Sequence, residues 1–290
     1  MPCGTKGKVI KMKNIVIIPN ETKDKDLAVT KKLIEVLSSR ARLTAEKKLC
    51  RLLSGVEFKE DEQLYDGADF VIVLGGDGTI LCAAEQCGKR NIPVMGINLG
   101  KVGFMTEIKT GEMDRAADAL LSGNYKTEKR MMMKVTVEKN GLEKSSVHAL
   151  NDVVIAKENA SMIMIKMFSG GEKINQYKAD GLIISTPTGS TGYSLSAGGP
   201  VADPLTEIFI ASPICAHELH ARPAVLSANK PILLRIDKAL GHEASVTVDG
   251  VQREIITLGD AVRIEKSQYC LPLIKIGGQS FYDVLTEKLR

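Results

Sequence analysis

The run Gly75-Gly76-Asp77-Gly78-Thr79 is the part of this sequence whose residue types most clearly imply chemistry. It directly follows the apolar, strand-like residues 70–74 and precedes the helix-like residues 80–89. A glycine-rich turn between a strand and a helix lets the backbone approach a ligand closely, and the free N–H groups at the start of the helix favour an anion. The pattern predicts a site for the phosphates of a donor, formed by Gly75, Gly76, Gly78 and Thr79.

Asp77 is the unusual member of this turn, because a carboxylate repels phosphate. Such a residue needs either a cation between the two charges or a ligand hydroxyl that the carboxylate deprotonates. Both interpretations indicate phosphoryl transfer rather than simple phosphate binding, and they make Asp77 the candidate catalytic residue. The alternative is a tight strand-to-helix turn in which Asp77 only caps the helix through its side chain.

A second unusual segment is the loop at residues 185–196, here called the hydroxyl loop, in which eight of twelve residues carry a hydroxyl group. No charged residue occurs between residues 181 and 202, so this loop can neither hold a metal nor neutralise a phosphate by charge. It offers neutral donors and acceptors and one aromatic face, which suit the sugars and bases of a nucleotide. A mobile Ser/Gly linker is the alternative. The pairs Asn151-Asp152 and Lys178 with Asp180 could complete a nucleoside pocket around the loop.

The elements that must position these residues change character along the chain. Up to about residue 130, strand-like and helix-like segments alternate in the manner of βαβ units. A parallel sheet with flanking helices is the economical fold, and its ligand crevice lies beyond the carboxyl ends of the strands, where Asp77 is expected. The expected strands are residues 14–18, 69–74 and 92–97, and the expected helices are 26–39, 80–89, 112–121 and, with a weaker pattern, 45–53.

From about residue 129 the apolar residues follow the two-residue period of strands. Asn140-Gly141 and Asp249-Gly250 predict hairpin turns, because both dipeptides readily adopt positive φ angles. The methionines of this half are expected in the core. Further strands are expected at residues 148–156, 162–168, 181–185, 231–237, 261–265 and 271–276, and a helix at 280–289.

The expected fold class is therefore an α/β N-terminal domain with a parallel sheet, followed by a β-rich, sandwich-like C-terminal domain. A C-terminal helix is expected to return to the first domain. The corresponding boundaries are an expected disordered leader at 1–12, the α/β domain at 13–129, the β-rich domain at 130–277 and the C-terminal helix at 278–290.

Composition limits the partners of the chain. Its 290 residues are 44% hydrophobic and 26% charged, with a formal net charge of +4, which is typical of a soluble globular protein. The basic residues are scattered and aromatic residues make up only 4% of the chain, without Trp, so no nucleic-acid partner is indicated. No apolar run is long enough for a membrane span or a signal-peptide core, and the six cysteines show no metal spacing. We therefore expect a cytoplasmic protein with reduced thiols and no membrane partner.

Four segments together resemble the NAD kinase family in order and spacing over roughly residues 14–288. They are GGDGT at 75–79, GINLGKVGF at 96–104, Asn151-Asp152, and DGLIISTPTGSTGYSLSAGGP at 180–200. The resemblance implies a transferase that binds NAD in a cleft and phosphorylates the 2′-hydroxyl of its adenosine ribose to give NADP. The donor would be ATP or inorganic polyphosphate, as in the bacterial type of NAD kinase, with a divalent cation, usually Mg²⁺. It also implies homodimers or homotetramers.

The same resemblance assigns roles to individual residues. Asp77 matches the family's proton acceptor, and Gly78 lies beside it. Because no Walker A sequence exists here, the donor would be held by the glycine turn and by Mg²⁺ on the phosphates rather than by a metal site of protein ligands. The positions that match the family's NAD pocket are Asp77, Gly78, Asn151, Asp152, Lys178, Asp180, Thr191, Gly192, Tyr193, Ser194, Leu195, Ser196 and Gln252.

Several positions depart from the family pattern. Asp152 stands where a glutamate is usual, Gly192 where an alanine is usual, and Asp249-Gly-Val-Gln252 where Asp-Gly-Gln is frequent, so either Val251 or Gln252 could fill the pocket position. Two other functions stay open at this point: a kinase of another small alcohol, such as a sugar phosphate or a lipid, and a non-catalytic sensor of NAD or NADP.

Overall fold

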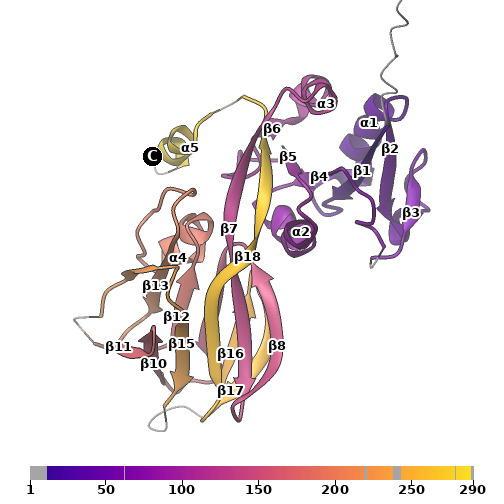
Figure 1. Cartoon of the computed structure of the whole chain (residues 1–290). Helices are drawn as coiled ribbons and strands as arrows, with labels where there is room; N and C mark the ends of the chain where they lie inside the picture. The colour runs from indigo at the N-terminus through magenta and orange to yellow at the C-terminus, as the bar shows by residue number, and fades with distance from the viewer. Residues whose placement is uncertain (1–11, 62, 219–220, 238–242, 278, 289–290) are drawn as a thin grey trace, which may run out of the picture. The chain divides into compact units, whose positions relative to one another are not determined.

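The computed structural model describes residues 12–61, 63–218, 221–237, 243–277 and 279–288. Most of the expected leader, residues 1–11, lies outside the described residues. The contacts divide the chain into two units (Figure 1). The first comprises Met1–Ile80, Ile92–Thr127 and Ile274–Arg290, and the second comprises Leu81–Asn91 and Glu128–Leu273.

The first unit contains a parallel sheet with the strand order β3-β2-β1-β4-β5, and β6 pairs with β5. Every residue of β4 is buried, as expected for a strand that is covered on both faces. The predicted parallel sheet is thus confirmed. Its strands are β1 (Lys13–Pro19), β2 (Ala41–Glu46), β3 (Glu57–Lys59), β4 (Phe70–Gly75), β5 (Val94–Asn98) and β6 (Ile108–Lys109).

Helices pack their apolar sides into the core of this sheet. Leu33, Ile34 and Leu37 of α1 recur at helical spacing and are buried together with Ile72 of β4. The helices of the first unit are α1 (Ala28–Leu37), α3 (Met113–Ser122), α5 (Phe281–Lys288) and the single turns η1 (Lys25–Leu27), η2 (Lys47–Leu49) and η3 (Thr110–Glu112). Helix α2 (Asp77–Arg90) begins in the first unit and continues in the second.

Two expectations for this unit have clear outcomes. The weak helix expected at residues 45–53 is wrong, because residues 41–46 form β2 and only Lys47–Leu49 makes a helical turn. Parallel pairing of β2 with both β1 and β3 outweighs the local helical pattern. The C-terminal helix exists, and its Phe281 ring lies 5.6 Å from the Phe104 ring, between ring centres, within the first unit.

The second unit contains two antiparallel sheets. One has the order β11-β10-β15-β18, with β7 beside β18 and β8 beside β7, and the other has the order β14-β13-β12-β9-β16-β17. The first sheet consists of β7 (Lys126–Lys139), β8 (Leu142–Ala149), β10 (Ile163–Ser169), β11 (Glu172–Ala179), β15 (Ile232–Ile236) and β18 (Ala261–Lys275). The second consists of β9 (Asp152–Lys157), β12 (Gly181–Ser185), β13 (Ile208–Ile214), β14 (Ala224–Ser227), β16 (Glu243–Val248) and β17 (Val251–Thr257).

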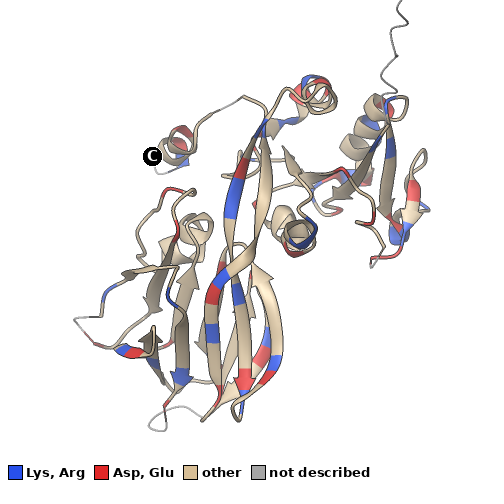
Figure 2. Cartoon of the chain, viewed as in Figure 1, with Lys and Arg blue, Asp and Glu red and all other residues tan. Residues whose placement is uncertain are grey.

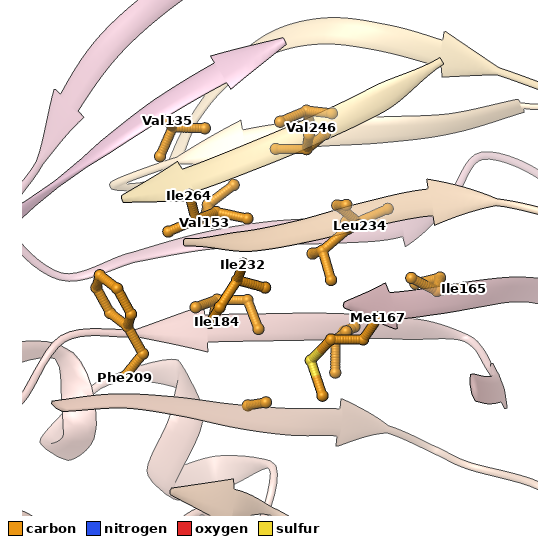
Figure 3. Packing of buried hydrophobic residues seen from close by; sticks show 14 of the residues in the cluster. Val135, Val153, Ile165, Met167, Ile184, Phe209, Ile232, Leu234, Val246 and Ile264 are labelled. Atoms are coloured by element: carbon orange, nitrogen blue, oxygen red, sulfur yellow. The ribbon is translucent and has the colours of Figure 1, made fainter. Parts of the chain in front are cut away.

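Side chains from both sheets form one core between them, which confirms the sandwich prediction. In Figure 3, Ile232 of β15 lies close to Ile184 of β12, and both belong to one buried cluster with Leu234 of β15 and Val246 of β16. Met167 belongs to this core, as expected for a methionine that fills space.

Both predicted hairpins are present. Asn140 and Gly141 have φ values of 51° and 77°, and Asp249 and Gly250 have 47° and 79°, the positive values that a two-residue hairpin turn requires. The two strands expected at 261–265 and 271–276 form a single strand, β18.

Charges are mixed in both units, with Lys and Arg lying among Asp and Glu rather than on one face of their own (Figure 2). Among the described residues, no helix is long and apolar enough to cross a membrane. The five cysteines that the structure describes, Cys50, Cys82, Cys87, Cys215 and Cys270, are free thiols.

Candidate active site

The glycine turn joins β4 to α2 as predicted. A Cβ atom on Gly75 would lie 2.2 Å from the Thr79 hydroxyl oxygen, so only glycine fits there. That hydroxyl accepts hydrogen bonds from the Gly76 N–H at 3.4 Å and from the Asn20 side-chain amide at 3.1 Å. The Thr79 hydroxyl therefore helps to hold the turn in its conformation. Gly78 is exposed, and Gly76 and Asp77 are half-buried.

Asp77 is the first residue of α2, and its carboxylate bonds to a different segment. Oδ2 accepts the Phe104 N–H at 2.7 Å. Oδ1 accepts the Met105 N–H at 3.1 Å, the Thr106 N–H at 3.0 Å and the Thr106 hydroxyl at 3.0 Å. The helix-capping alternative does not describe these bonds, because none of the four donors belongs to α2. All of these residues lie in the first unit.

Lys23 lies beside the same turn, although it was not among the residues predicted from the sequence. Its Nζ atom is 3.0 Å from the position that a Cβ atom on Gly76 would occupy. Lys23 is exposed and follows β1, the strand that lies directly beside β4 in the sheet. The turn therefore has a cation that can face an anion. The general rule that could have found it is that loops after neighbouring parallel strands meet at one sheet edge.

The second unit contains a cavity of about 390 Å³ that brings together several predicted residues. Asn151, Asp152 and Tyr193 line it, and Tyr193 is 48% exposed. The side-chain oxygen Oδ1 of Asn151 is buried and has no hydrogen-bond partner among the described residues. A buried polar atom without a partner costs stability, which indicates that a ligand group or water meets it. The lining residues are Leu81, Asn151, Asp152, Val154, Ala156, Tyr193, Thr247, Asp249 and Gly250.

Asp249 was not selected as a site residue from the sequence, where it marked a hairpin turn and the start of the Asp249-Gly-Val-Gln252 segment. Its carboxylate accepts the backbone N–H groups of Leu150, Asn151 and Asp152 at 2.7, 2.8 and 3.1 Å. Burial raises the pKa of Asp249, and these three hydrogen bonds oppose that effect. Asp249 therefore fixes the backbone that carries Asn151 and Asp152 into the cavity.

Asp152 has an electrostatic environment unlike that of a surface carboxylate. The residue is 7% exposed. Burial, followed by the nearby charge of Asp249, raises the pKa of Asp152 from 3.8 to about 7. Near neutral pH this carboxyl group is thus available both as a proton-bearing donor and as a charged acceptor.

The hydroxyl loop uses four of its eight hydroxyl groups, those of Thr186, Ser190, Thr191 and Ser194, in hydrogen bonds within the protein. The Thr186 hydroxyl donates to the Leu150 carbonyl at 2.5 Å, and the Ser190 hydroxyl donates to the Pro187 carbonyl at 2.7 Å. The Ser194 and Ser212 hydroxyls lie 2.9 Å apart. The buried Ser185 and Thr188 hydroxyls have no partner among the described residues. The loop therefore acts mainly as a scaffold, which consists of β12, the turn η4 (Thr188–Thr191) and the short helix α4 (Tyr193–Ser196).

This scaffold packs directly against the Asn151-Asp152 pair. A Cβ atom on Gly189 would lie 2.2 Å from the Asn151 carbonyl, and one on Gly192 would lie 3.6 Å from the Asn151 side-chain nitrogen. The structure thus joins the two segments that the sequence suggested as one pocket. Of the loop residues proposed for NAD, Tyr193 lines the cavity, while Thr191, Gly192 and Leu195 are half-buried, Ser194 is buried and Ser196 is exposed.

Three other predicted residues are not among those that line the cavity. Lys178 and Asp180 do not pair with each other, because Asp180 forms its ion pair with Lys157 at 2.7 Å. Gln252 and Val251 lie on β17 and are exposed, whereas Asp249 and Gly250 of the same hairpin line the cavity. Neither Val251 nor Gln252 is among the residues that line this cavity.

A divalent cation has no ready-made protein site in the part of the chain that the structure describes. No group of three or more His, Cys, Asp or Glu residues is close enough together to hold a metal ion there. The carboxylate of Asp77 already accepts four hydrogen bonds. These donor sets do not fit a metal held by protein ligands alone.

A phosphate turn with a fixed carboxylate and a nucleoside-sized cavity beside a tyrosine define a class, namely phosphotransferases that act on nucleotides. Comparison with known proteins gives the family. The model of the ATP-NAD kinase N-terminal domain matches residues 47–125, and that of the ATP-NAD kinase C-terminal domain matches residues 150–276. The chain therefore belongs to the NAD kinase family, and it is an enzyme that phosphorylates NAD to NADP with ATP.

Individual relatives agree with this assignment. The NAD kinase of Caldanaerobacter subterraneus subsp. tengcongensis is 40% identical over 281 residues, which cover 96% of this chain and 99% of that protein. The NAD kinase of Geobacter sulfurreducens is 39% identical with the same coverage. An Archaeoglobus fulgidus NAD kinase solved with ATP is 26% identical, with a TM-score of 0.73 over 96% of this chain and 98% of that one. Yeast NADH kinase solved with NADH shares the fold, with a TM-score of 0.89 at 22% identity over 96% of this chain and 87% of that one.

Proposed function

We propose that this enzyme places the new phosphate on the 2′-hydroxyl of the adenosine ribose of NAD and that Asp77 accepts the proton of that hydroxyl. As the hydroxyl oxygen forms its bond to the γ-phosphorus of ATP, the bond to the β,γ-bridging oxygen breaks and ADP leaves. The observation that carries the proposal is a half-buried carboxylate held by four donors at the start of the helix that follows the phosphate turn.

Two effects are expected to contribute to the rate of phosphoryl transfer. A general base contributes roughly 10² to 10⁴ in rate. Holding both substrates in a reactive geometry is worth more, since effective molarities correspond to about 7–11 kcal/mol. Fixed orientation of Asp77 and of the nucleotide is therefore at least as important as the basicity of the carboxylate.

The cavity in the second unit is the proposed site for the acceptor nucleotide. Asn151 and Asp152 offer hydrogen bonds to a ribose or base, and Tyr193 offers an aromatic face.

Donor phosphates are proposed to bind at Gly75, Gly76, Gly78 and Thr79 through the backbone of the turn. Lys23 would add charge compensation from the loop after β1. ATP and inorganic polyphosphate both present a terminal phosphoryl group to such a site, so polyphosphate remains a proposed second donor.

A divalent cation, Mg²⁺, is proposed to arrive with the donor phosphates and to neutralise part of their charge. Lys178, Asp180, Gln252 and the remaining residues of 191–196 are proposed to contact parts of NAD outside the cavity. Assembly as a homodimer or homotetramer and a cytoplasmic location complete the proposal. Light scattering on the purified full chain tests the assembly.

The direct test incubates the full chain with NAD, ATP and Mg²⁺ and follows NADP with an NADP-specific dehydrogenase. Phosphorus NMR of the product then distinguishes a 2′-phosphate from a 3′-phosphate. Parallel reactions with polyphosphate and with NADH define the donor and the acceptor. NADP carrying a 2′-phosphate supports the proposal, whereas NAD binding without any phosphorylated product would indicate a sensor.

A further inference from the structure

The two oxygens of the Asp77 carboxylate are not equivalent. Oδ1 accepts three hydrogen bonds, two from backbone N–H groups and one from the Thr106 hydroxyl, while Oδ2 accepts only the Phe104 N–H. A carboxylate has about four lone-pair sites, two on each oxygen. Oδ1 is therefore saturated, and Oδ2 keeps one site for a further hydrogen bond.

The direction of the Thr106 hydroxyl follows from its other neighbour. The Asn98 side chain is almost fully buried, and its Oδ1 accepts the Gly100 N–H at 2.6 Å. That bond fixes which end of the amide carries the hydrogens. The amide nitrogen, with two hydrogens, then donates to the Lys101 carbonyl at 2.8 Å, the Thr106 hydroxyl oxygen at 2.9 Å and the Thr106 carbonyl at 3.1 Å. The hydroxyl oxygen thus lies between a group that only donates and a carboxylate that only accepts. Because the hydroxyl oxygen accepts from Asn98, its own hydrogen points to Oδ1 of Asp77.

The approach of the loop to the carboxylate is unusually close at Gly103. A Cβ atom there would lie 2.0 Å from Oδ1 of Asp77 and 2.6 Å from the Thr106 hydroxyl oxygen. The Gly103 N–H also donates to the Thr106 carbonyl at 3.2 Å, which closes the loop around the carboxylate. Only glycine permits this geometry.

We propose that Thr106, with its hydroxyl oriented by Asn98, is a positioning residue that anchors Oδ1 of Asp77 and leaves Oδ2 as the oxygen that takes the ribose proton. This inference rests on the proposed role of Asp77 as proton acceptor. It adds which oxygen acts and which residues hold it. The hydroxyl of Thr106 remains with Thr106 throughout, so the only proton that moves is the one from the ribose hydroxyl to Oδ2.

Two substitutions of Thr106 test the inference in the full-length enzyme. Thr106→Val keeps the shape of the side chain but removes the hydroxyl, and we expect kcat to fall roughly 10- to 100-fold because the carboxylate loses its orientation. KM for NAD should stay within about threefold, since the nucleotide cavity is untouched. Thr106→Ser restores the hydroxyl and should restore kcat to within about threefold of wild type.

Thr30→Val is a matched control in the same unit. The Thr30 hydroxyl donates to the buried Asp24 carboxylate at 2.6 Å, which is the same chemistry at a place remote from the glycine turn in the sequence. We expect Thr30→Val to lower the midpoint of urea unfolding while kcat at saturating ATP stays at the wild-type value. Asp24 directly follows Lys23, so a shift of Lys23 would change KM for ATP rather than kcat. A loss of kcat that merely follows lost stability would appear in both valine variants.

The outcomes separate this inference from the proposed function. A wild-type enzyme that makes no NADP overturns the proposed function and the inference together. An active wild type whose Thr106→Val variant keeps wild-type kcat overturns the inference alone, as does a Thr106→Ser variant that is as slow as the valine variant. Low kcat in Thr106→Val, rescue by serine and normal kcat in Thr30→Val support it.

Discussion

Replacing Asp152 with asparagine should change how the stability of the protein depends on pH. The ordinary carboxyl pKa of 3.8 and the folded-state pKa of about 7 differ by roughly three pH units, and each unit corresponds to about 1.4 kcal/mol. Because the pKa is raised on folding, the protonated form favours the folded state. Its stabilising contribution is full below about pH 4 and is lost as the pH rises through about 7.

Asparagine resembles the protonated carboxyl group and does not titrate. We therefore expect Asp152→Asn to match wild type in the free energy of unfolding near pH 4.5 and to exceed it near pH 8 by about 2–4 kcal/mol. The raised pKa of Asp249 acts in the same direction but is common to both proteins. Urea unfolding of the ligand-free enzyme at several pH values measures the difference.

Asp118→Asn serves as the control, because the Asp118 side chain is 69% exposed and pairs with Arg40 at the surface. Its difference from wild type should stay small at every pH. If the difference between wild type and Asp152→Asn is also constant from pH 4.5 to 8, then the buried and charge-coupled environment assigned to Asp152 is wrong.

Three further substitutions probe other parts of the site. Tyr193→Ala should raise KM for NAD more than it lowers kcat, and the reverse pattern in steady-state kinetics would place Tyr193 outside the pocket. Lys23→Ala should raise KM for ATP by roughly 3- to 30-fold with KM for NAD unchanged, whereas an unchanged KM for ATP would remove Lys23 from the donor site. Gly103→Ala should lower kcat at least 10-fold because its Cβ would lie 2.0 Å from Oδ1 of Asp77; wild-type kcat in a folded variant would show that the loop moves freely.

The main layers of the fold could be predicted from local patterns in the sequence. The glycine turn, the helical spacing of α1 and the two Asx-Gly hairpins each act over a few residues, and the structure has all of them. Residues 45–53 show where this reasoning stops. The strand β2 is held by pairing with β1 and β3, a contact that no local pattern contains.

The candidate site was only partly predictable for the same reason. Asp77, Asn151 and Asp152 stand out by residue type beside glycine turns and apolar strands. Asp249 and Thr106 do not, because they act through hydrogen bonds to residues 99 and 29 positions away in the sequence, respectively. Such partners become visible only when the chain is folded, since residue type alone gives Thr106 no distinguishing feature.

The hydroxyl loop gives a further example of this limit. Its composition suggested many groups free to bind a nucleotide, yet Thr186 and Ser190 donate within the protein. Composition shows how many donors a segment carries but not where they point. The segment therefore positions Tyr193 and supports Asn151 more than it offers its own hydroxyls.

The role of Asp77 as proton acceptor is tested most directly by the rate of NADP formation and the dissociation constant for NAD, measured side by side for wild type and Asp77→Asn. Asparagine can keep an oxygen at the Oδ1 position but leaves the Phe104 N–H without its acceptor, which should cost about 1–3 kcal/mol of stability, so both enzymes are assayed well below their unfolding temperatures. We predict a fall in turnover of roughly 10²- to 10⁴-fold with NAD affinity changed less than about threefold. A folded Asp77→Asn variant that makes NADP within about tenfold of the wild-type rate would contradict the proposed mechanism.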